Sequence, residues 1–113
     1  MSEVLHIEDR SEFQDLLDTE TFLVVDFTAP GWCRPCQRFA PIFESTAEYA
    51  SVHSDWLGLT TFVAVDVDKA DWATEEFGIR GVPTVKLFHQ GEVLADLKAR
   101  AVLPLIDEIK SNF

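Results

Sequence analysis

The sequence predicts an α/β fold in which a central mixed sheet of four to five strands is flanked by about four helices. Three observations predict this class: strand-like and helix-like segments alternate along the chain, two strand segments are apolar on both faces, and the last two strand segments flank a tight turn. The 113 residues suffice for one hydrophobic core. We therefore expect residues 1–113 to form a single domain.

The first half of the chain predicts two strands and two helices. Residues 4–7 are a short strand, and Asp9 followed by Glu12 is a capping pattern that begins the first helix. Residues 21–27 are β-branched, aromatic and apolar on both faces, as expected of a central strand covered by helices. In residues 35–52 apolar side chains recur at helical spacing, which predicts a long second helix.

The second half predicts three strands and two helices. Residues 61–67 form another apolar strand, and residues 70–77 form a short helix that ends at a glycine. Residues 82–88 and 93–97 flank a Gln-Gly pair and predict an antiparallel hairpin. Residues 103–109 are an amphipathic final helix.

Charge and cysteine content narrow the functional classes. Twenty acidic residues against nine basic residues give a net charge of -11, which repels nucleic acid and anionic membranes and favours basic partners. The N-terminus shows no export signal, the longest apolar runs are far too short to span a bilayer, and the two cysteines do not suggest a disulfide-stapled secreted domain. We expect a protein of the reducing cytoplasm.

The strongest chemical signal is the motif Trp32-Cys33-Arg34-Pro35-Cys36, at the junction of a buried strand and the following helix. Two cysteines at this spacing can cycle between a dithiol and a disulfide. Cys33 lies where unpaired backbone N–H groups and the helix dipole lower a thiol pKa, which makes it the expected nucleophile, and Cys36 would resolve the mixed disulfide. Pro35 suits the first helical turn because it has no N–H to lose.

Two other interpretations of the cysteines stay open. They could form half of a zinc site, although His6, His53 and His89 are scattered and supply no second pair of ligands at recognisable spacing. They could also be inert core residues, although the neighbouring arginine and proline indicate a surface turn. We expect no bound metal and no cofactor.

Asp26 is a third candidate for the site. It lies between Val25 and Phe27 in a strand that is expected to be buried, where an unpaired carboxylate is costly and its pKa rises. A carboxyl group with a raised pKa is a candidate general base. The alternative is an aspartate at the end of a strand that caps a turn.

Several segments together resemble the thioredoxin family, and the similarity runs nearly end to end. The segments are Val25-Asp26-Phe27, Trp32-Cys33-Arg34-Pro35-Cys36, Gly78-Ile79-Arg80-Gly81-Val82-Pro83-Thr84 and Gly91-Glu92-Val93. The resemblance implies a thioredoxin fold and a monomer that reduces protein disulfides. It also implies an NADPH-dependent thioredoxin reductase as the electron donor.

The resemblance further implies roles for individual residues. Pro83 matches the family's cis-proline, which would present the backbone of Val82 to an extended substrate strand and keep metal from the thiolates, although a trans proline that opens a strand is the alternative. Asp26 would take the proton of Cys36 through water. The implied substrate groove consists of Trp32, Arg34, Pro35, Val82 and Pro83.

The chain departs from the family pattern at five places, one of which is Ala99 in place of a glycine common on the groove rim. Arg34 replaces a glycine and should favour the Cys33 thiolate, which makes the disulfide more oxidising. Gly31 is an additional residue that a β-bulge could absorb. Ala64 replaces a lysine, so Asp26 should stay protonated to higher pH. The link at 51–60 is longer than usual, which is expected to be a surface insertion tolerated at little cost.

Two alternative functions follow from these departures. A disulfide oxidase or isomerase is favoured by Arg34 and opposed by the missing export signal. A non-catalytic binding or assembly factor would use the acidic surface and the 51–60 link in place of the cysteines.

Overall fold

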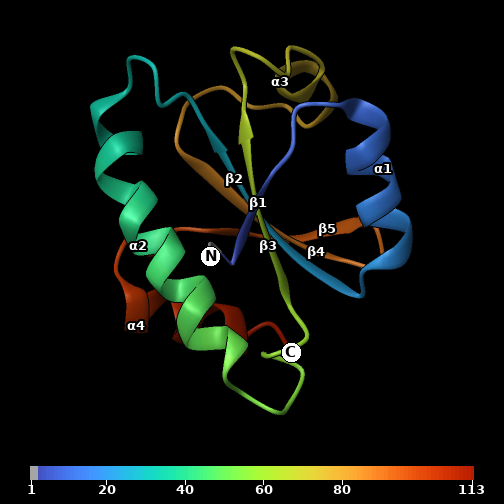
Figure 1. The fold of residues 1–113 in the computed structure, drawn as a ribbon, viewed down its shortest axis with the longest axis vertical. Coiled ribbons are helices and arrows are strands. Elements are labelled where there is room, and N and C mark those ends of the chain that lie inside the picture. Colours follow the sequence, from blue (N-terminus) through green and yellow to red (C-terminus); the bar gives the residue numbers. More distant parts are fainter. Residues whose placement is uncertain (1–2) are drawn as a thin grey trace.

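The computed structural model describes residues 3–113, which form a five-stranded sheet with helices on both faces (Figure 1). The predicted class and the predicted order of the elements are confirmed. The strands are β1 (Val4–His6), β2 (Phe22–Thr28), β3 (Thr61–Asp66), β4 (Thr84–His89) and β5 (Glu92–Leu97). The helices are α1 (Arg10–Thr19), α2 (Arg34–Ser51), α3 (Trp72–Glu76) and α4 (Val102–Lys110).

The sheet is mixed, with the strand order β1-β3-β2-β4-β5. β1 and β2 both run parallel to β3, whereas β4 is antiparallel to β2 and β5 is antiparallel to β4. The carboxyl ends of β2 and β3 and the start of β4 therefore meet at one edge of the sheet. That edge is where chain segments far apart in sequence can assemble a site.

Each face of the sheet has its own hydrophobic core. On one face α2 and α4 cover the sheet with Phe39, Phe43, Leu105, Ile106 and Ile109, all of them 2% exposed or less. On the other face α1 and α3 contribute Phe13, Leu17 and Ala73 to a second core. Full burial of a large apolar side chain contributes roughly 1.5–3 kcal/mol, so these two layers supply most of the drive to fold.

The start of α1 agrees with the predicted boundary but not with the predicted capping bonds. Asp9 is the N-cap residue, and its carbonyl oxygen accepts the N–H of Phe13. Its carboxylate accepts the hydroxyl of Ser11 and makes no side-chain capping bond to the helix. The Ser11 hydroxyl holds the pKa of Asp9 below its ordinary value. The capping pattern therefore predicted the helix start correctly. The Asp9 carboxylate, however, accepts the Ser11 hydroxyl and makes no capping bond.

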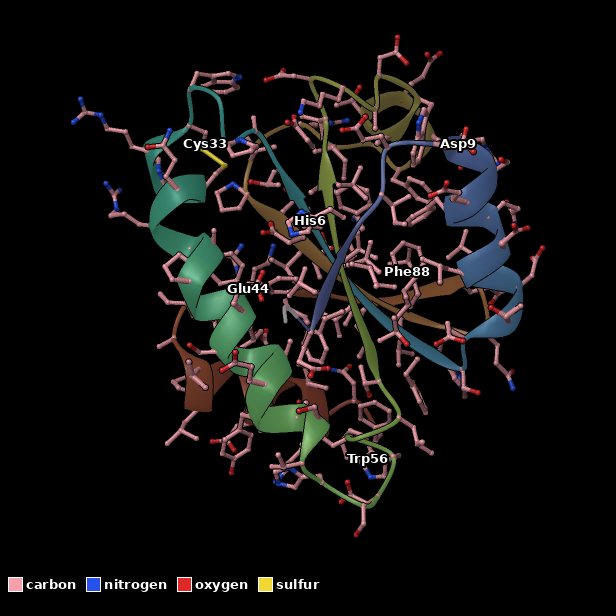
Figure 2. The ribbon with its side chains drawn as sticks, in the orientation of Figure 1. His6, Asp9, Cys33, Glu44, Trp56 and Phe88 are labelled. Carbon is pink, nitrogen blue, oxygen red and sulfur yellow. A yellow bond between two sulfur atoms is a disulfide. The ribbon has the colours of Figure 1, made fainter. Side chains whose placement is uncertain are left out.

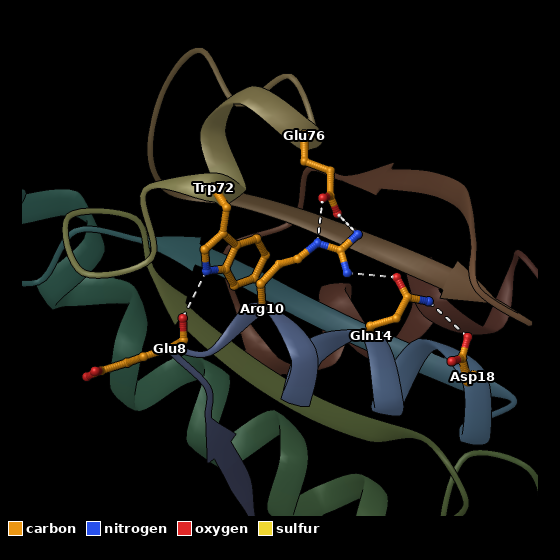
Figure 3. Close-up of polar contacts among 6 residues, drawn as sticks. All are labelled: Glu8, Arg10, Gln14, Asp18, Trp72 and Glu76. Atoms are coloured by element: carbon orange, nitrogen blue, oxygen red, sulfur yellow. Dashed lines mark hydrogen bonds and ion pairs between the residues drawn. The ribbon is translucent and has the colours of Figure 1, made fainter.

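Polar contacts join α3 to the start of α1 (Figure 3). Arg10 donates to both carboxylate oxygens of Glu76, from Nε at 2.9 Å and from Nη2 at 3.1 Å. The indole N–H of Trp72 donates to the carbonyl oxygen of Glu8 at 2.9 Å. Trp72 thus packs against the second core and also fixes the chain between β1 and α1.

The predicted hairpin between β4 and β5 is confirmed. Gln90 and Gly91 both have positive φ, at 52° and 85°, as a type I′ turn requires. β4 begins at Thr84 and not at the predicted Val82, because the bond between Val82 and Pro83 is cis and the chain there is irregular. This delay keeps Val82 and Pro83 out of the sheet and free to form a loop.

The link at 51–60 has exposed residues, as expected of a surface insertion, but it is also anchored against the protein. Leu57 is fully buried, and Trp56 stacks on Phe113 with 3.5 Å between ring centroids. Gly58 approaches the backbone so closely that a Cβ there would lie 1.8 Å from the carbonyl oxygen of His53. The insertion closes the end of the molecule opposite the cysteines (Figure 2).

Candidate active site

The two cysteines lie where the sequence placed them, at the start of α2, and they form a disulfide (Figure 2). Cys33 is the N-cap residue and Pro35 occupies the first turn. The backbone N–H of Cys36 donates to the Cys33 sulfur at 3.2 Å, and the two Cα atoms are 5.2 Å apart. The same N–H groups that cap the helix would stabilise a thiolate on Cys33 after reduction.

The burial of the pair is uneven. Cys36 is fully buried and Cys33 is 4% exposed, whereas Arg34 and Pro35 between them are exposed. Both sulfurs belong to a small cluster with Ala29, against which Val82 packs. Because the cysteines are bonded to each other, the interpretation as inert core residues is wrong. Cys33 is the sulfur nearer the solvent, as the attacking cysteine must be.

Val82 and Pro83 face the pair across a chain separation of about fifty residues. The Cys33 sulfur is 3.6 Å from the carbonyl oxygen of Val82, and the Val82–Pro83 peptide bond is cis. The expected cis-proline geometry is thereby confirmed. The loop presents backbone groups beside the Cys33 sulfur, where an extended peptide could pair with them.

Trp32 borders the pair as an exposed wall. Trp32 is 65% exposed, so it does not pack in the core. The indole N–H donates to a carboxylate oxygen of Asp68 at 2.8 Å. Asp68 follows β3 and was missed by sequence analysis, because nothing local links it to a tryptophan 36 residues away.

The additional residue Gly31 is absorbed in a turn, and the expected β-bulge in the strand is not found. β2 stays in register with β3 from Leu23 through Thr28. The turn follows the strand, with the N–H groups of Trp32 and Cys33 both donating to the carbonyl oxygen of Ala29 at 3.3 Å and 3.0 Å. The strand that carries Asp26 is therefore undisturbed by the insertion.

Asp26 is buried in the middle of β2, with 2% exposure, so the alternative of a turn-capping aspartate is wrong. Its Oδ1 atom has no hydrogen-bond partner among residues 3–113. Burial raises the pKa of Asp26 to about 7, even though the positive charge of Arg100 acts to lower it. The carboxyl group therefore changes its protonation state near neutral pH, as a general base requires.

A pocket of about 270 Å³ reaches Asp26 from the side of β1 and α2, where Figure 2 shows His6 and Glu44. Ala64 pairs with Asp26 in the sheet and lines this pocket, so the small side chain leaves the space open. Ala40, one helical turn after Cys36, lines it as well. The lining of the pocket is mostly apolar, but His6, Glu44 and Asp66 add polar groups to it. The pocket is large enough for water, which could carry protons between Asp26 and solvent.

A second pocket, of about 390 Å³, lies on the other side of the pair and was missed by sequence analysis. Its lining residues are Pro35, Arg38, Phe39, Ile42, Pro83 and Arg100. Arg38 could have been noticed as the residue one turn after Arg34 on α2. No local pattern in the sequence predicts that Arg100 lines this pocket, because Arg100 follows β5 and is far in sequence from α2.

The zinc interpretation requires further ligands near the cysteines. Within residues 3–113 no group of three or more His, Cys, Asp or Glu side chains is arranged to hold a metal ion. No helix in the same part of the chain is long and apolar enough to cross a membrane.

The site combines a disulfide at a helix start with a cis-proline loop beside a mixed sheet. This combination is typical of proteins that catalyse thiol–disulfide exchange. The thioredoxin family model matches residues 3–111. A thioredoxin from Mycoplasmoides gallisepticum is 44% identical over 88 residues, covering 78% of this chain and 80% of the relative. Thioredoxin-1 from Schizosaccharomyces pombe is 33% identical, covering 96% and 98%.

Solved structures agree with the sequence comparison. A Plasmodium falciparum thioredoxin structure superposes with a TM-score of 0.80 at 27% identity, covering 95% of this chain and 97% of that one. The chain belongs to the thioredoxin family and has the thioredoxin fold. It is a thioredoxin-type thiol–disulfide oxidoreductase, a protein-disulfide reductase, which confirms the function predicted from the cysteine motif over a non-catalytic binding factor.

Proposed function

We propose that Cys33 is the attacking residue, Cys36 the resolving residue and Asp26 the proton acceptor in the reduction of protein disulfides. The observation that carries the proposal is the position of the Cys33 sulfur, 3.6 Å from the Val82 carbonyl oxygen and at the N-terminus of α2. At this position the N-terminus of α2 can stabilise a thiolate on Cys33. The backbone of Val82 can form hydrogen bonds that align a substrate.

The exchange runs in two balanced steps from the reduced dithiol. The Cys33 thiolate attacks one sulfur of the substrate disulfide, forming a mixed disulfide and releasing the other substrate sulfur as a thiolate that takes up a proton. Asp26 then accepts the proton of the Cys36 thiol through water, and the Cys36 thiolate attacks Cys33. The second substrate sulfur leaves as a thiolate and takes up a proton from solvent, Asp26 releases its proton to solvent, and the protein is left with the Cys33–Cys36 disulfide.

The substrate groove follows from the same geometry. Trp32 and Pro35 form its exposed rim, Arg34 projects beside them, and the Val82–Pro83 loop forms the opposite side. An extended segment of the substrate would pair with the backbone of Val82 and hold its disulfide over Cys33. Trp32 is kept in position by its bond to Asp68.

Further proposals concern the setting of the reaction. Family membership supports disulfide-containing proteins as substrates and a thioredoxin reductase as the electron donor. The two cysteines of the chain are both used in the redox pair, which supports work as a monomer in a reducing compartment such as the cytoplasm.

The assignment of the two cysteines is tested by trapping. Cys36→Ser, reduced and mixed with a disulfide-containing peptide, should accumulate a mixed disulfide through Cys33, because the resolving thiol is gone. Cys33→Ser should accumulate none, since Cys36 is fully buried. Non-reducing mass spectrometry reads both results, and trapping by Cys33→Ser with none by Cys36→Ser would reverse the assignment.

A second candidate function, disulfide oxidase or isomerase, is favoured by Arg34, which lies directly between the cysteines. The potential of the pair decides between the two directions. Equilibration in thiol redox buffers should give a value near about -270 mV for a reductase, whereas about -180 to -120 mV would favour oxidation or isomerisation.

A further inference from the structure

The arginines of this acidic protein are concentrated around the active site. The chain carries a net charge of -11 and has five arginines, at positions 10, 34, 38, 80 and 100. Arg34 lies between the cysteines, Arg80 lies in the loop before Pro83, and Arg38 and Arg100 line the pocket beside Pro83. Four of the five arginines therefore lie in the region that meets the substrate, although the protein as a whole is acidic.

None of these four arginines forms an ion pair with a carboxylate among residues 3–113, although the charge of Arg100 also acts on buried Asp26. Among residues 3–113 the ion pairs of lysine and arginine are Arg10–Glu76, Lys69–Glu8 and Lys86–Asp96, and none involves an active-site arginine. Arg34, Arg38 and Arg80 are exposed, and Arg100 is half-buried. Their charges are available to a partner.

Arg100 is held in position by the fold. Its guanidinium lies 5.1 Å from the ring centroid of Phe39 and donates to the carbonyl oxygens of Leu97 and Ala99 at 2.8 Å and 3.0 Å. A third, longer contact reaches the carbonyl oxygen of Pro83 at 3.4 Å. Three of its five N–H groups are used in this way, so two remain for a ligand.

The pocket combines an apolar floor with two guanidinium groups. Pro35, Phe39, Ile42 and Pro83 supply apolar surface, while Arg38 and Arg100 supply the charge within a volume of about 390 Å³. A glutamate or aspartate side chain fits this combination, because its methylene groups suit the floor and guanidinium groups bind carboxylates through paired hydrogen bonds.

The pocket is close enough to the Cys33 sulfur to bind a side chain that neighbours the substrate cysteine in sequence. It adjoins Pro83, and the carbonyl oxygen of the preceding Val82 is 3.6 Å from the Cys33 sulfur. An extended chain advances about 3.3 Å per residue, so a side chain within about two residues of the substrate cysteine would reach it.

We propose that this pocket selects substrate proteins that carry an acidic side chain within about two residues of the disulfide cysteine. The proposal rests on the proposed function, since it assigns the substrate class of the same groove. It runs against the preference for basic partners that the net charge alone suggests, because contacts in the groove are made at short range where local charge dominates.

The test compares disulfide peptides that are identical except for Glu, Gln or Lys two residues from the cysteine. The fully reduced protein is mixed with each peptide in a single turnover, and the fluorescence change of the exposed Trp32 reports the reaction. We expect the Glu peptide to react about tenfold faster than the Lys peptide at low salt, with the Gln peptide between them and the preference falling as salt is added.

A matched pair of variants shows whether the preference comes from the pocket. Arg38→Gln removes a charge from the pocket, and Lys110→Gln removes the same charge from the exposed end of α4. Arg38→Gln should lose most of the preference for the Glu peptide over the Lys peptide. Lys110→Gln should keep the preference.

The outcomes separate this inference from the proposed function. Equal rates for the three peptides, a faster Lys peptide, or equal losses in both variants would overturn acidic selection and leave disulfide reduction intact. Failure of the reduced protein to react with any of the peptides would overturn the proposed function itself.

Discussion

Replacing Asp26 by asparagine should make the protein more stable at alkaline pH. The buried carboxyl has an oxygen without a hydrogen-bond partner among residues 3–113, and burial raises its pKa from 3.8 to about 7. Since one pKa unit corresponds to about 1.36 kcal/mol, the ionised form costs the folded state about 4 kcal/mol. Asparagine has nearly the same shape and carries no charge.

The pH dependence has a defined sign. Below pH 3.8 the carboxyl is protonated in both the folded and the unfolded chain, so it has no effect on the pH dependence of stability. Between pH 3.8 and about 7 the unfolded chain releases the proton while the folded chain keeps it, so stability falls as pH rises. Above about pH 7 the full cost is present.

Urea unfolding of the disulfide form, repeated at intervals between about pH 4 and pH 8, measures this effect. The stability difference between Asp26→Asn and the natural protein should grow by about 4 kcal/mol across that range. The control is Asp15→Asn, which makes the same substitution at an exposed position on α1. If the Asp26→Asn difference does not change with pH, or changes no more than the Asp15→Asn difference, the carboxyl is not destabilised by burial and the argument fails.

Three further predictions concern the redox pair, the Asp26 pocket and the 51–60 link. Arg34→Gly should lower the reduction potential by about 10–20 mV, as expected for losing one exposed charge beside a thiolate, and an unchanged potential would contradict the role of this charge. Ala64→Lys should place an ammonium group in the pocket and bring the pKa of Asp26 below 7 in an NMR titration; a value that stays at about 7 would mean that the two groups do not meet. Trp56→Ala should lose its stacking on Phe113 and about 1–3 kcal/mol of stability in urea, and a negligible loss would show that the link contributes little.

Features that depend on neighbours in the chain were predicted correctly. The helix that begins at the cysteines, the hairpin turn at Gln90 and Gly91, and the burial of Asp26 in an apolar strand all rest on local spacing and composition. The errors were local too: Val82 was assigned to a strand although the cis bond to Pro83 delays it, and Gly31 was assigned to a bulge. In both cases the residue types were compatible with two local backbone conformations. The local sequence does not decide between them.

By itself the sequence determined the order of the elements, the redox pair and its place at a helix start, because helix periodicity, turn chemistry and capping involve residues at most a few positions apart. Tertiary structure alone decided which distant groups surround that pair. The approach of Val82 to Cys33, the bond from Trp32 to Asp68, and the pocket shared by Arg38 and Arg100 each join residues from separate elements. Such contacts depend on how the helices pack on the sheet, and no local pattern records that packing.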